Sequence, residues 1–560
     1  MSTFSHLLHQ QYQHVPERNA LTLLRAGQPD LPVTVAELLQ GSAGVAQTLA
    51  RAGIKPGEVV ILILQHSLEH VFAYFGTILQ GAIPSIMPFL TEKLLPERYR
   101  ADLAALVGVT QPAAIITYPE FEGEVRAAVG IDSPVRVILL STQMDPPCEP
   151  DFTLLPGLQR RPEDIVLLQH SSGTTGLQKG VALSHQAILN QLESYSRRLQ
   201  LNDADVLVSW LPLYHDMGLI AGFLMPLLRG IPLVLLSPFD WVRNPARLMQ
   251  AVSRYRGTLS WLPNFAYNFC AQKVRDRDLE GVDLSSWRAI SNCSEPMRYE
   301  SHQAFLARFA PYGLRADALC TCYAMAENVF AVTQGGITGP VTVDVIDREA
   351  MQVERVARPS PAAEAVIHML SAGRPIEKVE VRVVDEHGRA VPDRQIGEVT
   401  LRSNCMLTEY YHRPDATAKA FRSGWYLTGD YGYLADGELY VTGRKKDLII
   451  VGGKNIHPQD LEELAMTVPG VHPGRVVVFG IFNDTQGTEE VFLVAEVDTA
   501  DPAVREQIAD QIRQTITRGS AVALRHVHLV DKHWLVKTSS GKTARGANRE
   551  KYQQEFLTQS

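Results

Sequence analysis

The sequence has little of what marks secreted and nucleic-acid-binding proteins. Only six of its 560 residues are cysteine, and none of them forms a C-x-x-C pair. In a chain of this length they are expected to be buried apolar residues in a reducing compartment rather than a disulfide framework. Basic residues are not in excess, since 53 lysines and arginines face 61 aspartates and glutamates. The net charge of −8 argues against bulk electrostatic binding to nucleic acid.

Long uninterrupted hydrophobic runs are absent as well. The N-terminus has no basic segment followed by an apolar one, so no signal peptide is expected. The most apolar long stretch, Gly218–Phe239, contains Arg229 and three prolines. A membrane span needs about 20 residues without such interruptions, so this stretch predicts a buried helix, a turn and a strand. We therefore expect a soluble, cytoplasmic protein with no membrane span.

What is present is the pattern of an α/β protein. Hydrophobic residues make up 45% and charged residues 20%, which is enough to bury a large core. Short apolar runs such as Val59–Leu64 and Ile231–Leu236 alternate with helical patterns such as Thr34–Ala52 and Asn244–Tyr255. Continuous apolar runs of this length favour parallel strands that helices cover on both faces. The alternation predicts layered sheets and helices.

The last third of the chain changes character. Gly339–Gly373, rich in Ala, Pro, Val and Arg, is interpreted as an insertion or a flexible excursion. Lys378–Asp385 and Glu398–Ser403 then predict strands of a smaller β unit. A boundary is expected near Gly443–Asp447, after which strand-like and helical segments predict a small α+β domain.

The most informative segment is Leu167–Gly180, LLQHSSGTTGLQKG. A buried strand ends there, and a loop of small and hydroxyl residues follows, with Lys179 behind it. Small residues let backbone N–H groups approach an anion, hydroxyls donate to its oxygens, and the lysine adds charge. The order differs from a Walker A loop, because Lys179 stands between Gln178 and Gly180.

Five further motifs follow in order along the chain. They are WLPLYHDMGL (Trp210–Leu219), CYAMAE (Cys322–Glu327), GWYLTGD (Gly424–Asp430), GRKKDLIIVGGKNIHPQDLE (Gly443–Glu462) and KTSSGK (Lys537–Lys542). Together with the Ser/Thr loop they resemble the adenylate-forming superfamily of acyl-CoA synthetases, acyl-AMP ligases, luciferases and nonribosomal adenylation domains. PNFAYNFC (Pro263–Cys270) and SEPM (Ser294–Met297) look most like the fatty acyl-AMP ligase branch and the related fatty acyl-CoA ligases.

The resemblance implies two domains with an active site between them. Residues 1–446 would form an N-terminal adenylation domain with a β subdomain and the insertion at about 339–373, where the fatty acyl-AMP ligase branch carries one. Residues 447–560 would form a small mobile domain. A carboxylate would attack the α-phosphate of Mg-ATP, giving acyl-AMP and pyrophosphate, and a thiol would then take the acyl group.

Roles are implied at the matching positions. Glu327 would bind Mg²⁺, Asp430 would bind the ribose hydroxyls, and Lys542 would bridge the acyl carboxylate and the α-phosphate. His215 is a further catalytic candidate. The other nucleotide-binding candidates are Ser171, Ser172, Gly173, Thr174, Thr175, Gly176, Lys179, Ser294, Glu295, Pro296, Cys322, Tyr323, Ala324, Met325 and Arg444, of which Tyr323 would pack on the adenine.

The remaining candidates concern the acid, the thiol and the hinge. The acyl pocket is expected to involve Met217, Gly218, Trp261, Asn264 and Phe265, and the hinge Lys446 and Asp447. A Gly452-Gly453 turn matches CoA ligases, whereas Ala326 matches the acyl-AMP ligase branch. The thiol acceptor is therefore expected to be either an acyl carrier protein or CoA. Six basic residues could face an acidic carrier protein or form a solvated surface: Arg525, Lys532, Lys537, Arg545, Arg549 and Lys551.

Two alternatives stay open from the sequence. The same mechanism could act on an aryl or an amino acid, although an amino acid would need an acidic partner for its ammonium group. Asp216 is the nearest candidate, but it belongs to the shared HDMG motif. The chain could also be a nucleotide-binding regulator with a degenerate site. The retained lysines and carboxylates argue against that role, because a binding module does not need the C-terminal Lys542.

Overall fold

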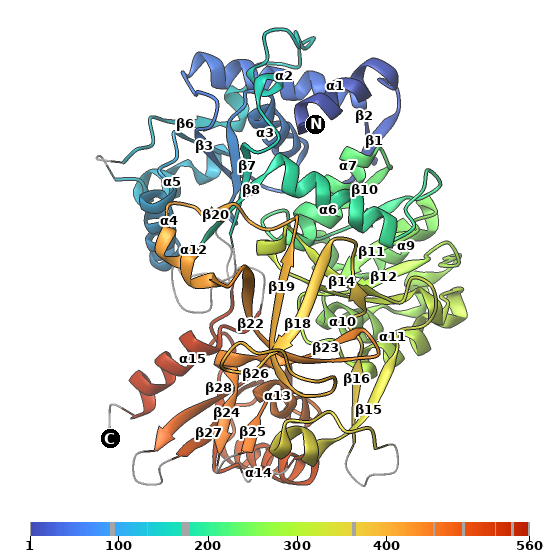
Figure 1. The fold of residues 1–560 in the computed structure, drawn as a ribbon, viewed down its shortest axis with the longest axis vertical. Coiled ribbons are helices and arrows are strands. Elements are labelled where there is room, and N and C mark those ends of the chain that lie inside the picture. The colour runs from blue at the N-terminus through green and yellow to red at the C-terminus, as the bar shows by residue number, and fades with distance from the viewer. Residues whose placement is uncertain are drawn as a thin grey trace.

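The computed structural model describes residues 2–89, 96–130, 133–170, 179–360, 366–451, 454–483, 488–520, 522, 524–538 and 542–557. We call the elements up to β23 the large lobe and those from β24 onward the C-terminal lobe. Figure 1 shows the C-terminal lobe at the lower end, below the sheets of the large lobe. Among the described residues, no helix is both long and apolar enough to cross a membrane.

Two large sheets form the large lobe. In spatial order the first contains β17 (Arg374–Pro375), β14 (Ala331–Gly335), β13 (Leu319–Ala324), β12 (Ala289–Asn292), β11 (Leu259–Leu262), β9 (Leu207–Ser209), β10 (Leu233–Leu236), β1 (Asn19–Leu24) and β2 (Leu31–Thr34). The second contains β20 (Glu409–Tyr410), β8 (Gly180–Ser184), β7 (Ile165–His170), β4 (Ile83–Ile86), β3 (Val59–Ile63), β5 (Ala114–Thr117) and β6 (Val137–Leu140). Their central strands pair in parallel and are buried, which confirms the α/β prediction.

Helices cover these sheets. They are α1 (Phe4–His14), α2 (Val35–Arg51), α3 (Leu68–Leu79), α4 (Pro96–Thr110), α5 (Glu122–Ala128), α6 (His185–Arg198), α7 (Met225–Arg229), α8 (Pro238–Arg243), α9 (Ala246–Tyr255), α10 (Asn264–Lys273), α11 (Tyr299–Phe309) and α12 (Pro414–Ala420). Thr34 starts α2 with a capping box, in which its side chain and that of Glu37 bind each other's backbone N–H groups. The apolar stretch Gly218–Phe239 forms helix, turn and strand as predicted, with a π-helix, η4 (Met217–Leu224), leading into α7 and β10.

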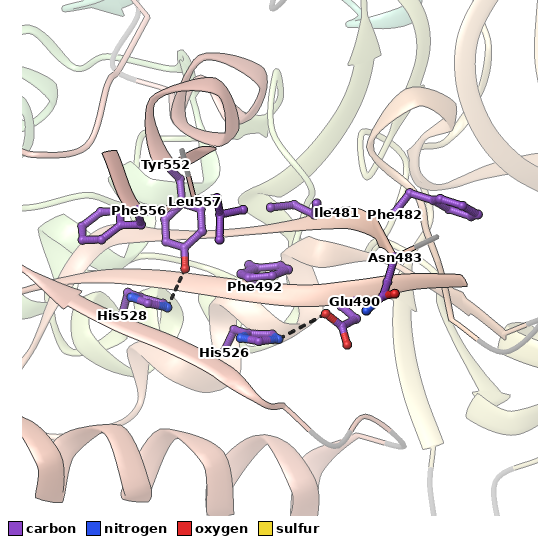
Figure 2. A pocket seen from close by; sticks show the side chains of 10 residues that line it. All are labelled: Ile481, Phe482, Asn483, Glu490, Phe492, His526, His528, Tyr552, Phe556 and Leu557. Carbon is purple, nitrogen blue, oxygen red and sulfur yellow. Dashed lines mark hydrogen bonds and ion pairs between the residues drawn. The ribbon is translucent and has the colours of Figure 1, made fainter. Parts of the chain in front are cut away.

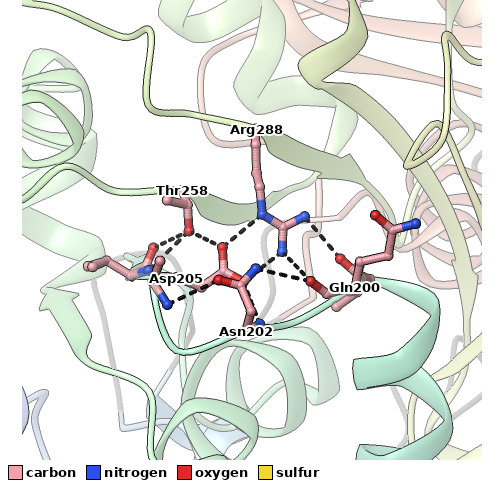
Figure 3. Close-up of polar contacts among 8 residues, drawn as sticks. Gln200, Asn202, Asp205, Thr258 and Arg288 are labelled. Carbon is pink, nitrogen blue, oxygen red and sulfur yellow. Dashed lines mark hydrogen bonds and ion pairs between the residues drawn. The ribbon is translucent and has the colours of Figure 1, made fainter.

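A buried ion pair ties strands of the first sheet together (Figure 3). Arg288 contacts both carboxylate oxygens of Asp205, with Nε–Oδ1 and Nη2–Oδ2 distances of 2.8 and 2.7 Å. Asp205 also accepts from the Thr258 hydroxyl at 2.7 Å and from the Asn202 amide at 3.0 Å. Arg288 donates in addition to the carbonyl of Gln200. Because every oxygen of the buried carboxylate has a donor, the pair can hold the turn before β9 in place.

A smaller antiparallel sheet is built from strands late in the large lobe. It contains β18 (Val379–Val384), β19 (Gly397–Ser403), β22 (Trp425–Ala435), β21 (Phe421–Arg422) and β23 (Glu438–Arg444). Figure 1 shows it between the large sheets and the C-terminal lobe. The two strands predicted for this region match β18 and β19.

The segment 339–373 is folded where the structure describes it. It forms the antiparallel pair β15 (Val343–Asp347) and β16 (Val366–Leu370), with the helical turn η9 (Ala350–Glu354) between them. Asp344 accepts hydrogen bonds from Arg394 at 2.9 Å and from the Tyr433 hydroxyl at 2.8 Å, so the hairpin is fixed to the antiparallel sheet. The described part of the segment is therefore ordered, and its assignment as an insertion stays a prediction.

The C-terminal lobe has apolar cores of its own. Its elements are β24 (Ile449–Val451), β25 (Lys454–Ile456), α13 (Pro458–Met466), β26 (Val471–Asn483), β27 (Thr488–Val497), α14 (Pro502–Gly519), β28 (His526–Val530) and α15 (Arg545–Tyr552). Tyr552, only 1% exposed, holds α15 against the sheet of β26, β27 and β28, where its ring packs on Phe479 and Phe492. α15 begins at Arg545, three residues after Lys542.

Beside Tyr552 the same sheet bears an open groove of about 380 Å³ (Figure 2). Phe492 and His526 stack on its floor with ring centres 4.1 Å apart, and Phe556 lies at its rim. His526 also forms an ion-pair contact with Glu490 at 3.3 Å. The groove is separate from the residues predicted to carry chemistry.

Candidate functional site

The first group of predicted site residues lies where β13, β22 and β23 approach one another. The Tyr323 hydroxyl, at the end of β13, donates to Oδ2 of Asp430 at 2.6 Å. Asp430 pairs with Arg444 across β22 and β23, and the Arg444 Nε lies 3.8 Å from its Oδ1. Burial raises the pKa of Asp430, and the Arg444 charge opposes that shift. The hydroxyl of Tyr323 and the charge of Arg444 thus orient the Asp430 carboxylate, whose oxygens can accept hydrogen bonds from a polar ligand.

The second group joins the two lobes. The His215 Nδ1 lies 2.6 Å from Oδ1 of Asp216, just before η4. Although burial alone would raise the pKa of Asp216, His215 and then Lys542 hold that pKa below its usual range. Burial in turn lowers the pKa of Lys542, against the pull of the Glu295 and Asp216 carboxylates. Lys542 of the C-terminal lobe is therefore within electrostatic range of acidic residues of the large lobe.

Glu327 lies in a third group, together with two tyrosines. Its Oε1 accepts from the Tyr410 hydroxyl at 2.8 Å, and that hydroxyl lies 3.0 Å from the hydroxyl of Tyr426. Lys179 lies over the Tyr410 ring, with Nζ 4.6 Å from the ring centre. Burial raises the pKa of Glu327, hydrogen bonds from the two tyrosines oppose this, and Asp216 adds to the rise.

Electrostatic interactions connect the three groups into one site. The charge of Asp216 raises the pKa of Glu327, and the charge of Arg444 lowers the pKa of Lys542. The pKa of Lys446 is lowered by burial first, then by Arg444 and also by Lys179, while Asp430 raises it. Predicted site residues that are distant in sequence therefore lie within electrostatic range of one another.

Backbone conformation at this site is unusual. Ser294, a predicted nucleotide-binding residue, has φ of 71°, and Val329, which follows the turn carrying Glu327, has φ of 64°. A β-branched residue in this region is costly, and such strain concentrates at functional sites. Glu295, next to Ser294, accepts from the Phe265 amide at 2.9 Å. Pro296 follows in the same turn, whereas Cys322 and Ala324 lie on β13 and Met325 directly after it.

The five predicted acyl-pocket residues differ in their surroundings. Met217 is 3% exposed at the start of η4, and a Cβ added to Gly218 would lie 2.1 Å from the Pro212 carbonyl oxygen. Trp261 is 2% exposed and its Nε1 donates to the Tyr195 hydroxyl at 2.9 Å. The side chain of Asn264 accepts from the Arg298 amide at 3.0 Å. These contacts give Gly218, Trp261 and Asn264 roles in packing.

Phe265 is the exposed member of that set, with 43% of its surface accessible. Its ring meets the edges of Trp210 and Trp241, which stack on each other with centres 3.5 Å apart. An aromatic wall therefore stands beside the Glu295 turn.

Two sets of predicted residues lie outside the described part of the chain. They are the loop Ser171, Ser172, Gly173, Thr174, Thr175 and Gly176, and the turn Gly452 and Gly453.

The lobes are clamped together near the predicted hinge. Arg298 of the large lobe forms ion pairs with Asp460 at 3.0 Å and Glu463 at 3.1 Å, both on α13. Two hydrogen bonds link the insertion to the C-terminal lobe. Asn455 donates to the carbonyl of Gln352, and Arg348 donates to the carbonyl of Gly519.

Of the two predicted hinge residues, Asp447 is tied into the C-terminal lobe. Its Oδ2 lies 2.6 Å from Nη1 of Arg545, which also binds Glu462 at 2.7 Å. Arg545 is therefore engaged inside the lobe. Other members of the basic set are engaged similarly: Lys532 pairs with Asp498, Lys537 donates to Gly474, and Lys551 donates to Trp534.

Sequence reasoning missed Tyr410 and Arg298, and gave Tyr426 and Asp216 no catalytic or positioning role. Tyr426 and Asp216 stand inside recognised motifs, GWYLTGD and YHDMG, which could have singled them out. Tyr410 stands in no quoted motif, and its role depends on the pairing of β20 with β8, which joins residues more than 200 positions apart.

Comparison with known proteins identifies the family. The family model described as "AMP-binding enzyme" matches residues 8–411. The chain belongs to the AMP-binding enzyme family. It is an adenylate-forming enzyme, and AMP-binding enzymes use ATP. The cations Lys179, Arg444 and Lys542 suit the negative charge of the ATP phosphates.

Relatives within the AMP-binding enzymes match along nearly the whole chain. A medium-chain-fatty-acid–[acyl-carrier-protein] ligase, JamA of Moorena producens, is 30% identical over all of this chain and 96% of its own. A 4-hydroxyphenylalkanoate adenylyltransferase of Mycobacterium marinum is 30% identical over all of this chain and 92% of its own. A solved structure from a study of fatty acyl-adenylate ligases from E. coli and L. pneumophila superimposes with a TM-score of 0.90 at 29% identity, covering 100% of this chain and 99% of that one.

Proposed function

We propose that this enzyme activates a medium- or long-chain fatty acid with ATP. It releases pyrophosphate, forms acyl-AMP, and then passes the acyl group to a phosphopantetheine thiol. The observation that carries the proposal is that Lys542, from the C-terminal lobe, is buried within electrostatic range of Glu295, Arg444 and Asp216 of the large lobe. A site that only bound a nucleotide would not need a lysine from the C-terminal lobe among these charges.

The chemistry assigns each group a task. A free carboxylate resists attack by a thiol because it is anionic and has no good leaving group, and AMP provides one. Attack of the acid on the α-phosphate places negative charge on phosphate oxygens, which the cations Lys542 and Arg444 would stabilise. Asp430, oriented by Tyr323 at 2.6 Å, would accept hydrogen bonds from the ribose hydroxyls.

Glu327 suits a magnesium ion. Its carboxylate offers the hard oxygen ligands that Mg²⁺ prefers, and one oxygen is already oriented by Tyr410. No cluster of three or more His, Cys, Asp or Glu side chains that could hold a metal occurs in the described parts of the chain. Mg²⁺ binding would therefore depend on the phosphates of ATP as further ligands, which is usual for this ion. When bound, the ion would neutralise phosphate charge.

The proposal of a fatty acid is supported by the relatives. JamA is named for medium-chain fatty acids, and the closely superimposing structure comes from work on fatty acyl-adenylate ligases. The second candidate is an aryl-substituted acid, favoured by the relative named for 4-hydroxyphenylalkanoates at the same identity. Phe265, the exposed ring beside the buried Trp210 and Trp241, offers a contact surface for either an alkyl chain or a phenyl ring.

An acyl carrier protein is the proposed thiol donor, because JamA is named as an acyl-carrier-protein ligase. CoA is the alternative that the Gly452-Gly453 pair suggests. The carrier would not be recognised through Arg545, which is engaged by Asp447 and Glu462.

ATP–pyrophosphate exchange over a panel of acids tests the proposal. We expect exchange with medium- or long-chain fatty acids, and loss of exchange in Lys542→Ala. Lys532→Ala is the matched control, since this lysine of the same lobe pairs with Asp498 at 2.9 Å. Exchange with aryl acids alone would support the second candidate, and wild-type exchange in Lys542→Ala would refute the mechanism. Mass detection of the thioester with carrier protein or CoA separates the acceptors.

A further inference from the structure

Tyr410 lies between two groups that the proposed function assigns to ATP. Its hydroxyl donates to Oε1 of Glu327 at 2.8 Å, and its ring stands 4.6 Å from Nζ of Lys179. Tyr410 is only 4% exposed, although Lys179 is exposed. The side chain thus connects a solvent-facing cation with a buried carboxylate.

The backbone around Tyr410 makes this position rigid. β20 pairs antiparallel with β8, with Tyr410 opposite Val181, and the Tyr411 amide donates to the carbonyl of Gly180 at 2.8 Å. On the other side, the Leu407 amide donates to the Glu327 carbonyl at 2.8 Å. A short strand is therefore bound both to the segment that carries Lys179 and to the turn that carries Glu327.

The two contacts of Tyr410 use different parts of the side chain. The hydroxyl fixes one oxygen of Glu327, and a hydrogen bond to a charged carboxylate is stronger than one between neutral groups. The ring face attracts the ammonium group of Lys179. Tyr426 supports the hydroxyl from 3.0 Å, so its orientation does not depend on Glu327 alone.

We propose that Tyr410 is a positioning residue that couples the two phosphate-binding arms of the site. Its hydroxyl orients Glu327 for the magnesium ion of Mg-ATP, and its ring holds Lys179 toward the phosphates. This inference rests on the proposed function, because it takes ATP as the ligand. Tyr410 itself touches neither nucleotide nor acid in this role.

The two parts of the side chain can be removed separately. Tyr410→Phe keeps the ring under Lys179 and deletes the hydroxyl, whereas Tyr410→Leu deletes both. The matched control is Tyr411→Phe, because Tyr411 is the next residue along and its ring stacks on His412 with centres 4.1 Å apart. Melting curves identify any variant that no longer folds.

Calorimetry of ATP binding, with magnesium chloride and with EDTA, measures the contributions of Glu327 and Lys179 to ATP affinity without depending on turnover. In Tyr410→Phe we expect the gain in ATP affinity on adding Mg²⁺ to fall about tenfold, with the affinity in EDTA within about twofold of wild type. Tyr410→Leu is expected to lose roughly a further fivefold, and to lose it in EDTA as well. Tyr411→Phe should match wild type in both buffers.

Kinetics add a second measurement. In Tyr410→Phe the KM for Mg-ATP is expected to rise while the KM for the acid stays unchanged. Equal losses in both buffers for Tyr410→Phe, or no loss in either, would overturn the coupling. If Tyr410→Leu does not fold, the Phe variant alone decides the outcome. Failure of the proposed function would look different, since the wild-type enzyme would then show no ATP-dependent exchange with any acid.

Discussion

Arg298 is expected to control how often Lys542 reaches the active site. Its guanidinium, 22% exposed, bridges the large lobe to Asp460 and Glu463 on α13, whose side chains are 33% and 38% exposed. Partly exposed ion pairs contribute about 0.5–1 kcal/mol each. Replacing Arg298 with Gln removes both pairs and leaves two neighbouring carboxylates. The arrangement of the two lobes seen here should therefore be destabilised by about 1–2 kcal/mol. Its population relative to other arrangements of the lobes would fall about 5- to 30-fold.

The assay separates the two half-reactions. If the C-terminal lobe moves about the predicted hinge, Arg298→Gln should slow ATP–pyrophosphate exchange by about fivefold or more, because fewer molecules hold Lys542 in place. Thioester formation from supplied acyl-AMP should not slow, since it does not need this arrangement of Lys542.

Arg308→Gln is the matched control for Arg298→Gln. Arg308 lies on α11, is also 22% exposed, and pairs with Asp276 at 2.7 Å inside the large lobe. It should leave both half-reactions unchanged. The reasoning is refuted if the two variants slow exchange equally, or if Arg298→Gln slows both half-reactions to the same extent.

Three further substitutions test other parts of the structure. Asp205→Ala leaves Arg288, which is 25% exposed, without its carboxylate and should cost about 1.5–3 kcal/mol of unfolding free energy in urea titrations. Burial alone would raise the pKa of Asp205, but Arg288 holds that pKa below the unfolded value. This stability is therefore present above the unfolded pKa and is lost as pH falls through the folded pKa. Tyr323→Phe removes the donor to Asp430 and should raise the KM for ATP about tenfold with the KM for the acid unchanged; an unchanged KM for ATP would contradict the ribose role. Gly218→Ala places a methyl 2.1 Å from a carbonyl oxygen and should cost about 2–3 kcal/mol, seen as a lower melting temperature or as insoluble protein.

Much of the fold could be predicted because its strands are apolar runs. Val59–Leu64 and Ile231–Leu236 correspond to β3 and β10, and Thr34–Ala52 corresponds to α2 within one residue at each end. The structure of the segment 339–373 was harder to predict. Its strand β15 is partly exposed at every second residue, and Asp344 on that strand accepts hydrogen bonds from Arg394 and Tyr433, which come later in the chain. Pairings of that kind are set by tertiary structure and leave no local pattern.

The same limit applies to the site. The motifs identified Asp430, Glu327 and Lys542. Each of these residues stands at a fixed place in its motif and has a charged group suited to its proposed task. The motifs could not show that Trp261 and Asn264 are engaged in internal hydrogen bonds, because an apolar or amide residue in a motif can equally well line a pocket or pack in a core. Nor could they find Tyr410, whose partners are distant in sequence and adjacent only once β20 pairs with β8.

The ion pairs of Arg545 bear on how such enzymes can be recombined. Asp447 is one of the two expected hinge residues, yet its carboxylate is bonded to Arg545, which begins α15 98 positions later. Arg545 also binds Glu462. A hybrid in which the crossover falls after Asp447 would separate that carboxylate from the arginine it neutralises. We expect functional exchanges of the C-terminal lobe between relatives to cross over before Asp447, so that all three residues come from one parent.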